Sequence, residues 1–403
     1  MVDVVSLLSS SIKKINPSPT VAMLSKAKEL KAQGIDVLSL SIGESDFDTP
    51  DNIKKAAHEA IKAGKTKYTP VDGISELKNA ILNKYQNRLN LNLNNIIVSS
   101  GAKQVIYNCF IATIEEDDEV IIPAPYWVSY PDMVKIARGK PVVVECKEKS
   151  NFKLTPDLLE SAITKRSKWL ILNSPNNPTG MKYSKNELKA LAEAIKKYPN
   201  LHVLSDDIYE SMVFDNEVYS LIDVAPELAD RIFIINGVSK TYAMTGWRIG
   251  YGIGSEEVIK AMKTVQSQST SNPCSISQYA SVEALNGDQS FVSTCVRSFQ
   301  KRRDLACGLL NEIDGITCIE PQGAFYLFSS CEDLLGKKTS NGTVIKDSYD
   351  FCEFLIEQAR VIVIPGNAFG MNGYFRFSYA VSEEQIKEAI KRIKTACSSL
   401  QKN

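Results

Sequence analysis

The sequence is most informative at Ile232-Phe233-Ile234-Ile235-Asn236-Gly237-Val238-Ser239-Lys240-Thr241-Tyr242-Ala243-Met244-Thr245-Gly246-Trp247-Arg248-Ile249-Gly250. Its first four residues form an apolar run that is typical of a strand buried in a sheet. Lys240 follows that strand, and Arg248 comes eight residues later. A lysine amine held in such a place can form a Schiff base once it has lost its proton, and an arginine can bind a phosphate. Together the two residues indicate a site for pyridoxal 5′-phosphate.

The same stretch resembles the lysine motif of class I pyridoxal-phosphate-dependent aminotransferases, S-x-S/A-K-x-x-x-M-x-G-W-R-x-G. It departs from that motif at Gly237, where many members have a phosphate-binding serine, so we expect no phosphate contact there. A single lysine after a strand is most often a solvated surface residue. The spacing of Lys240 to Gly246-Trp247-Arg248 favours a functional site instead, and the resemblance covers almost the whole chain.

Length and composition are ordinary for a soluble globular protein. The chain has 403 residues, 44% of them hydrophobic and 23% charged, with 47 basic and 47 acidic side chains. The length allows more than one domain, and the balanced charge gives no reason to expect nucleic acid or an acidic membrane surface as a partner. Nine scattered cysteines without a CxxC spacing and only two histidines provide little for a metal site. We therefore expect reduced thiols, no metal and a cytoplasmic protein.

No targeting or membrane segment is predicted. Asp3 interrupts the apolar residues at the N-terminus and no basic segment precedes them, which does not fit a signal peptide. No apolar run approaches the roughly 18 residues of a membrane span.

Strands and helices alternate through the middle of the sequence, which predicts an α/β fold with a mostly parallel sheet flanked by helices. The expected strands cover residues 96–99, 119–122, 141–144, 169–173, 201–205 and 232–235, and the expected helices include 102–113, 184–198 and 256–268. A long helical stretch at 273–310 leads to a smaller α+β unit with strands at 316–319, 324–328, 361–364 and 374–379, and helices at 349–357 and 383–396. We expect a large cofactor-binding domain at 46–299 and a small domain formed by 1–45 and 300–403.

Chemically useful residues follow the predicted parallel strands, at the edge where such sheets bind ligands. The list, in chain order, is Gly101-Ala102-Lys103 opening a helix, then Trp127, Asn177, Asp206, Tyr209 and Lys240. Taken singly these are weak signals, because Asn177-Pro178 reads as a turn and Asp206 as a helix cap. Their joint order is what points to one site.

Each residue type suits pyridoxal phosphate. A carboxylate such as Asp206 keeps the pyridine nitrogen protonated, and Asn177 and Tyr209 can donate hydrogen bonds to the phenolic oxygen of the ring. Trp127 can stack on the ring. The helix start at Gly101-Ala102-Lys103 suits the phosphate. The family resemblance implies the same roles for these positions, and a pyridoxal-phosphate-transferase fold of the aspartate aminotransferase type.

Three further segments resemble family motifs. Gly43-Glu44-Ser45-Asp46-Phe47 resembles the G-E-P-D-F turn, in which Gly43 would lie at the substrate carboxylate. Tyr68 lies in a Y-x-x-x-x-G segment whose tyrosine reaches the phosphate in a neighbouring subunit, which implies a homodimer with shared active sites. Arg376 matches the strand arginine that binds the substrate α-carboxylate, a task for a bidentate guanidinium.

The resemblance is closest to bacterial-type aspartate aminotransferases. Another branch binds the distal carboxylate with an arginine before a Ser-Asn-Pro triplet, yet no arginine occurs in residues 264–271 here. The bacterial type instead uses a lysine after the phosphate turn and an N-terminal threonine, which Lys103 and Thr20 match. The substrate-binding set is therefore Thr20, Gly43, Lys103, Trp127, Asn177 and Arg376.

The expected function is transfer of the amino group of L-aspartate to 2-oxoglutarate by a ping-pong mechanism, with Lys240 as the catalytic residue. Partners are then small amino and keto acids. A prephenate or aromatic aminotransferase on the same scaffold is the nearest alternative. More remote alternatives are a pyridoxal-phosphate-dependent carbon–sulfur lyase and a non-catalytic regulator that binds the cofactor.

Overall fold

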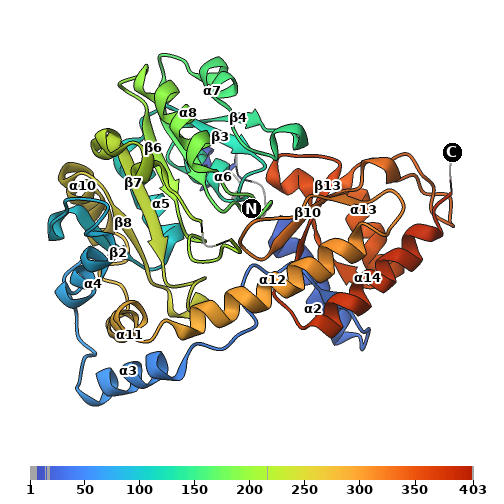
Figure 1. Cartoon of the computed structure of the whole chain (residues 1–403), viewed down its shortest axis with the longest axis horizontal. Coiled ribbons are helices and arrows are strands. Elements are labelled where there is room, and N and C mark those ends of the chain that lie inside the picture. Colours follow the sequence, from blue (N-terminus) through green and yellow to red (C-terminus); the bar gives the residue numbers. More distant parts are fainter. Residues whose placement is uncertain (1–6, 14, 16–18, 216, 402–403) are drawn as a thin grey trace.

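The structure is a computed structural model that describes residues 7–13, 15, 19–215 and 217–401. A seven-stranded sheet forms the centre of the larger unit (Figure 1), with the strand order β2-β8-β7-β6-β5-β3-β4. Its strands are β2 (Ile96–Ser99), β3 (Glu119–Ala124), β4 (Lys140–Glu145), β5 (Ser167–Asn173), β6 (His202–Asp206), β7 (Ile232–Gly237) and β8 (Gly250–Ile253). Only β8 runs against the others, because it pairs antiparallel with both β2 and β7. The predicted α/β class with a mostly parallel sheet is confirmed.

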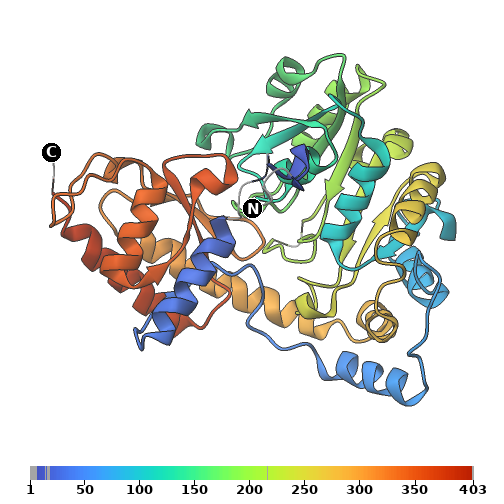
Figure 2. The same cartoon turned by 180° about the vertical axis from the view of Figure 1, so that it is seen from behind.

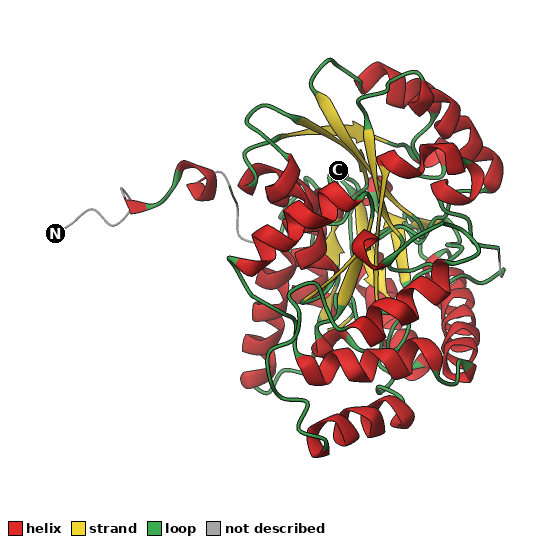
Figure 3. Cartoon of the chain, turned by 90° about the vertical axis from the view of Figure 1, so that its left-hand side faces the viewer, coloured by secondary structure: helices red, strands yellow, loops and turns green. Residues whose placement is uncertain are grey.

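Helices cover both faces of this sheet (Figure 3). Successive side chains of a strand point to opposite faces, and both sets are apolar here. In β7, Phe233 and Ile235 pack with α5, α6 and α10, whereas Ile232 and Ile234 pack in the core that contains α3, α4, α8 and α11. The helices are α1 (Ser10–Lys13), α2 (Pro19–Ala32), α3 (Asp51–Lys62), α4 (Ser75–Tyr85), α5 (Ala102–Thr113), α6 (Tyr130–Ile136), α7 (Pro156–Ala162), α8 (Lys185–Lys196), α9 (Leu221–Val224), α10 (Glu256–Ser267), α11 (Ser275–Asn286), α12 (Ser290–Leu310), α13 (Ser348–Phe354) and α14 (Glu383–Ser398).

A smaller unit carries its own sheets. Its four-stranded sheet has the order β12-β13-β10-β9, and β1 pairs in parallel with β11. The bounds are β1 (Leu38–Ser39), β9 (Thr317–Cys318), β10 (Tyr326–Ser330), β11 (Val361–Ile362), β12 (Ile364–Pro365) and β13 (Tyr374–Ser378). The N-terminal α2 packs on this unit through Met23 and Leu30 (Figure 2), and α12 runs from the large unit to the small one (Figure 1). Helix α12 continues without a break through residues 299 and 300, so the expected domain boundary between these two residues stays a proposal.

The structure differs from the expected elements at several places. The short β1 was not expected, and the strand expected at 361–364 is two strands, β11 and β12, that belong to different sheets. β8 has no predicted counterpart, because Gly250 and Gly252 weaken the strand pattern. A Cβ at Gly252 would lie 2.5 Å from Cζ of Phe233, so the glycine allows a close approach to β7. The helical stretch expected at 273–310 is two helices, and α11 ends at its C-cap, Gly287.

Candidate active site

A cleft of about 420 Å³ opens where the predicted parallel strands end and the small unit faces the large sheet. The sequence-predicted residues that line it are Gly43, Ala102, Lys103, Trp127, Asn177, Asp206, Tyr209, Lys240, Arg248 and Arg376. Gly101 lies directly behind this lining and faces the guanidinium of Arg248. Segments that are far apart in the sequence therefore meet at this edge of the sheet, as expected for residues that follow parallel strands.

Besides Gly101, two predicted residues do not line the cleft. Tyr68 is 92% exposed in the single chain. Thr20 belongs to helix α2, but the structure does not describe the placement of its side chain. Their roles stay predictions.

Lys240 lies beyond the end of β7 and is partly buried, and its Nζ donates a hydrogen bond to the carbonyl of Gly43. Burial lowers the pKa of Lys240 to about 8, and the positive charges of Arg376 and Arg248 act in the same direction, against the nearby carboxylate of Glu44. A less basic amine loses its proton more readily near neutral pH, which is what a nucleophile and proton carrier needs.

Asp206, the last residue of β6, is a buried carboxylate in the floor of the cleft. The hydroxyl of Tyr130 donates to its Oδ2 at 2.6 Å, and the N–H of Ile208 donates to its Oδ1 at 3.3 Å. Burial raises the pKa of Asp206 to about 6, while both hydrogen bonds and the charge of Lys240 oppose that rise. The carboxylate is therefore mostly ionised at neutral pH, and a cationic group above it would be stabilised.

The turn between β2 and α5 is shaped to hold an anion. No side chain caps the first turn of α5, so its free N–H groups point outward beside Arg248. Gly101 has a φ of +93°, and a Cβ there would lie only 2.1 Å from Nη2 of Arg248. A Cβ at Gly250 would lie 2.1 Å from the nitrogen of Ala102, so β8 also passes close to this turn.

Arg376 is a buried cation with unused hydrogen-bonding capacity. Its Nη1 donates to Oδ1 of Asn177 at 2.9 Å and its Nη2 to the carbonyl of Ser41 at 2.6 Å, whereas its Nε has no partner. Its guanidinium lies 4.6 Å from the ring centre of Tyr326 and 5.1 Å from that of Phe369. Among the described residues no carboxylate pairs with it, so an anionic ligand would satisfy both the charge and the free N–H.

Lys103 is placed for a second anionic group. It lies at the start of α5 with its Nζ 4.8 Å from the ring centre of Trp127. Burial and the nearby charge of Arg248 lower the pKa of Lys103. Within the described part of the chain it forms no salt bridge, and a lysine at a helix start is disfavoured by the helix dipole. Both facts favour a ligand as its partner.

These residues fit pyridoxal 5′-phosphate. The cleft offers a phosphate-sized turn with an adjacent arginine, an ionised carboxylate on its floor and a lysine with reduced basicity. Asn177 uses its carbonyl oxygen for Arg376, which leaves its amide group to donate to a ring oxygen. The glycine at position 237, where the family motif has a serine, also has a physical reason, since a Cβ there would lie 2.9 Å from the carbonyl of Ile249.

Nine residues that line the cleft were not predicted as functional, and Tyr130, Ser239 and Tyr326 are among them. Ser239 matches a position of the lysine motif, and that match was a usable signal. Tyr130 lies three residues after Trp127 and its ring packs edge-on against that tryptophan at 5.3 Å. No sequence pattern marks Tyr326, because its neighbours Ala324 and Phe325 read as an ordinary core strand.

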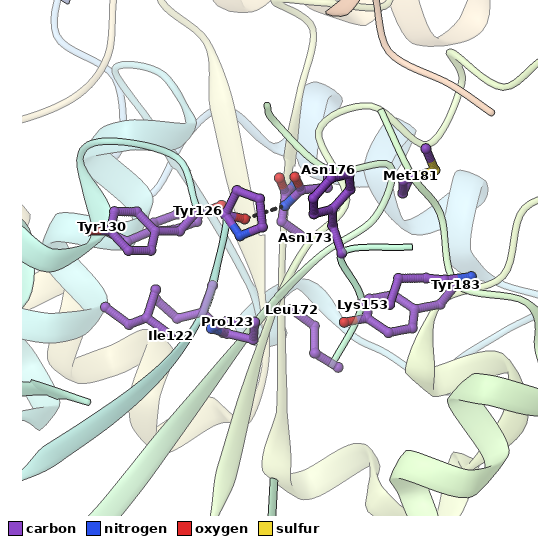
Figure 4. A pocket seen from close by; sticks show the side chains of 13 residues that line it. Ile122, Pro123, Tyr126, Tyr130, Lys153, Leu172, Asn173, Asn176, Met181 and Tyr183 are labelled. Carbon is purple, nitrogen blue, oxygen red and sulfur yellow. Dashed lines mark hydrogen bonds between the residues drawn. The ribbon is translucent and has the colours of Figure 1, made fainter. Parts of the chain in front are cut away.

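A second, much smaller cavity lies beside the cleft, between β3 and β5 (Figure 4). Its volume of about 20 Å³ suits a single water molecule. It is lined by residues such as Tyr126, Lys153, Asn176 and Tyr183, and none of the predicted site residues borders it. We therefore regard it as part of the scaffold. No cluster of His, Cys, Asp and Glu that suits a metal, and no helix able to cross a membrane, occurs among the described residues.

Comparison with known proteins assigns the family. The model of class I and II aminotransferases matches residues 35–393, so the chain belongs to that family. Enzymes of this family use pyridoxal 5′-phosphate, and the fold is that of the pyridoxal-phosphate transferases.

Relatives with specific names match over their full length. A probable aspartate/prephenate aminotransferase of Rickettsia bellii is 56% identical over 98% of this chain and 100% of its own. An aspartate/prephenate aminotransferase of Cereibacter sphaeroides is 51% identical over the same shares. The crystal structure of the aspartate aminotransferase from Rhizobium meliloti superposes with a TM-score of 0.95, at 49% identity over 98% of this chain and 99% of that one.

Proposed function

We propose that this aminotransferase transfers the amino group of L-aspartate to 2-oxoglutarate, which gives oxaloacetate and L-glutamate. The observation that carries the proposal is one cleft that is lined by Lys240, Asp206 and the unpaired cation Arg376. The names of relatives that match over their full length support the same activity.

Different residues of the cleft would bind the cofactor and the substrate. The first turn of α5 and Arg248 would hold the phosphate, and Asp206 would hold a proton on the ring nitrogen. When bound, pyridoxal 5′-phosphate supplies an electron sink for the negative charge left at the substrate Cα. Arg376, which has one N–H to spare on each terminal nitrogen, would bind the α-carboxylate.

Lys240 carries the proton in the central step. Its Nζ would accept the proton from the substrate Cα and would later donate it at the neighbouring carbon of the cofactor. Its lowered pKa of about 8 serves both directions, because the amine releases a proton near neutral pH more readily than an ordinary lysine and is still basic enough to take one up. The partly buried position of Lys240 also limits the access of water to this transfer.

Lys103 would select a dicarboxylic substrate by pairing with the distal carboxylate. Replacing Lys103 with Met should lower kcat/KM for aspartate about 10- to 100-fold, the range expected for the loss of a hydrogen bond to a charged group. Lys103→Arg, which keeps the charge, should retain more of that activity. Equal loss in both variants would show that the charge is not what matters.

Prephenate is a second candidate substrate. Several relatives bear the name aspartate/prephenate aminotransferase, and prephenate also carries a second carboxylate for a distal cation. Assaying amino transfer to prephenate with aspartate or glutamate as donor tests this directly, and Lys103→Met should reduce both reactions.

We also propose a homodimer, because the family resemblance gives Tyr68 a role at the phosphate of a neighbouring subunit. A tyrosine that is 92% exposed in one chain is of use to the phosphate only if a second copy brings its cleft to it. We further propose a cytoplasmic location, which agrees with nine cysteines of which none is disulfide-bonded. Sedimentation of the purified protein would test the dimer.

The absorption spectrum of the purified protein is the first test of the function. Addition of L-aspartate without an acceptor should shift the visible cofactor band to shorter wavelength and release one equivalent of oxaloacetate. Steady release of pyruvate and ammonia without any keto acid would indicate a lyase instead. A stable band that no amino acid changes would indicate a binding protein without turnover.

A further inference from the structure

Tyr326 lies at the junction of three parts of the cleft. It is the first residue of β10 and is fully buried. Its hydroxyl lies 2.7 Å from the hydroxyl of Tyr209, and its ring lies under the guanidinium of Arg376 at 4.6 Å. A Cβ on Gly43 would come within 2.6 Å of the same hydroxyl, so the Gly43 turn closes over it.

The two hydroxyls can share their hydrogen bond in either direction, and the surroundings decide which. Each tyrosine has one proton to donate. If Tyr209 donated to Tyr326, it would have no proton left to donate to the phenolic oxygen of a cofactor in the cleft that it lines. If Tyr326 donates to Tyr209, both protons have an acceptor, and Tyr209 is free to donate into the cleft. Within the described residues, the Tyr326 hydroxyl forms no other hydrogen bond.

The second arrangement also strengthens the bond that Tyr209 makes. A hydroxyl that accepts a hydrogen bond becomes a better donor, and such chains polarise one another more strongly in a buried setting. Tyr209 and Tyr326 are both buried, in the core between the two units. The Tyr326 ring meanwhile packs against the cation that would bind the substrate carboxylate, so the ring and the hydroxyl have separate tasks.

We propose that Tyr326 is a positioning residue, which donates its hydroxyl to Tyr209 and thereby directs the Tyr209 proton towards the phenolic oxygen of the cofactor. This inference rests on the proposed function. It separates two contributions of one side chain: the hydroxyl sets the proton affinity of the Lys240–cofactor linkage, and the ring supports Arg376.

The direction of the effect follows from charge. Donation to the phenolic oxygen stabilises the negative charge that remains uncompensated when the Lys240–cofactor linkage loses its proton, so it lowers the midpoint of that titration. Tyr326→Phe removes the donor to Tyr209 and keeps the ring. The midpoint of the visible band should therefore rise by about 0.2–0.5 pH units, the size expected when one neighbouring charge-assisted bond weakens by roughly 10–30%.

The experiment is a spectrophotometric pH titration of the cofactor-loaded protein without substrate. Tyr183→Phe is the matched control, because Tyr183 is also buried and its hydroxyl accepts a hydrogen bond from the N–H of Leu154, beside the small cavity of Figure 4. The control should keep the wild-type midpoint. Binding of maleate, a dicarboxylate probe, should change less than about threefold in Tyr326→Phe, because the ring beneath Arg376 remains.

A second variant keeps the inference testable if Tyr326→Phe does not fold. A ring-fluorinated tyrosine at position 326 keeps the hydroxyl and makes it a stronger donor, so the midpoint should fall below that of the wild type. Coincident midpoints in wild type and both variants would overturn the inference while leaving the function intact. A wild-type protein with no titrating visible band would overturn the proposed function together with it.

Discussion

Asp206 should make the cofactor-free protein less stable, and Asp206→Asn should relieve that cost. The carboxylate is buried, and its pKa is raised from 3.8 to about 6 because burial disfavours its charged form. The folded state therefore holds the proton more tightly than the unfolded state does. Between these two pKa values stability falls as the pH rises, and the cost is complete above the folded value.

The magnitude follows from the two pKa values. A shift from 3.8 to about 6 corresponds to roughly 3 kcal/mol at pH 8 and to about 1.6 kcal/mol at pH 5, where the carboxyl is still largely protonated in the folded state. Asp206→Asn removes the titration. Its amide retains partners, since the hydroxyl of Tyr130 can accept as well as donate and the N–H of Ile208 still has an oxygen.

The assay is urea unfolding of cofactor-free protein at one fixed protein concentration, at several pH values from 5 to 8. The variant should be more stable than the wild type, with a difference that grows by about 1.4 kcal/mol across this range. A flat or decreasing difference for Asp206→Asn would refute the reasoning. With cofactor bound the order should reverse, since the variant has lost the charge beneath the ring nitrogen.

Three other substitutions have distinct expected outcomes. Tyr130→Phe removes the 2.6 Å hydrogen bond to Asp206, so the acid limb of the pH–rate profile should move up by about 1–2 units; an unchanged profile would contradict this. Gly101→Ala places a Cβ 2.1 Å from Arg248 at a φ of +93°, and should lower cofactor affinity at least tenfold by equilibrium dialysis, with about 1–3 kcal/mol of strain. Tyr68→Phe should weaken cofactor binding yet change the free energy of unfolding by less than about 0.5 kcal/mol, because the side chain is exposed in the single chain.

The sequence was sufficient to predict the central sheet and most of the cleft. The strands at 96–99 and 232–235 are continuous apolar runs, and a residue that follows such a strand must emerge at a predictable edge. Lys240, Asp206 and Asn177 could be placed for that reason. Their roles remain predictions, because proximity in one cleft does not show what each residue does.

What escaped prediction depends on contacts between distant segments. Tyr326 matters because β10 brings it to Tyr209, 117 residues earlier in the chain. Strand β8 was missed because its glycines serve close packing against β7 and α5 rather than strand propensity. The role predicted for Tyr68 concerns the cleft of a second subunit, and it therefore stays a prediction.

The reversed strand β8 also has a consequence for biosynthesis. It is the only sheet neighbour of β2, so residues 96–99 stay unpaired in the sheet until residues 250–253 have emerged. About 150 residues separate these segments, which a ribosome adds in roughly 8–30 seconds at ordinary elongation rates. During that interval an apolar edge with free backbone groups is open to wrong partners. The nascent chain should depend on chaperones most strongly before Gly250 appears, and a truncated chain that ends before β8 should aggregate.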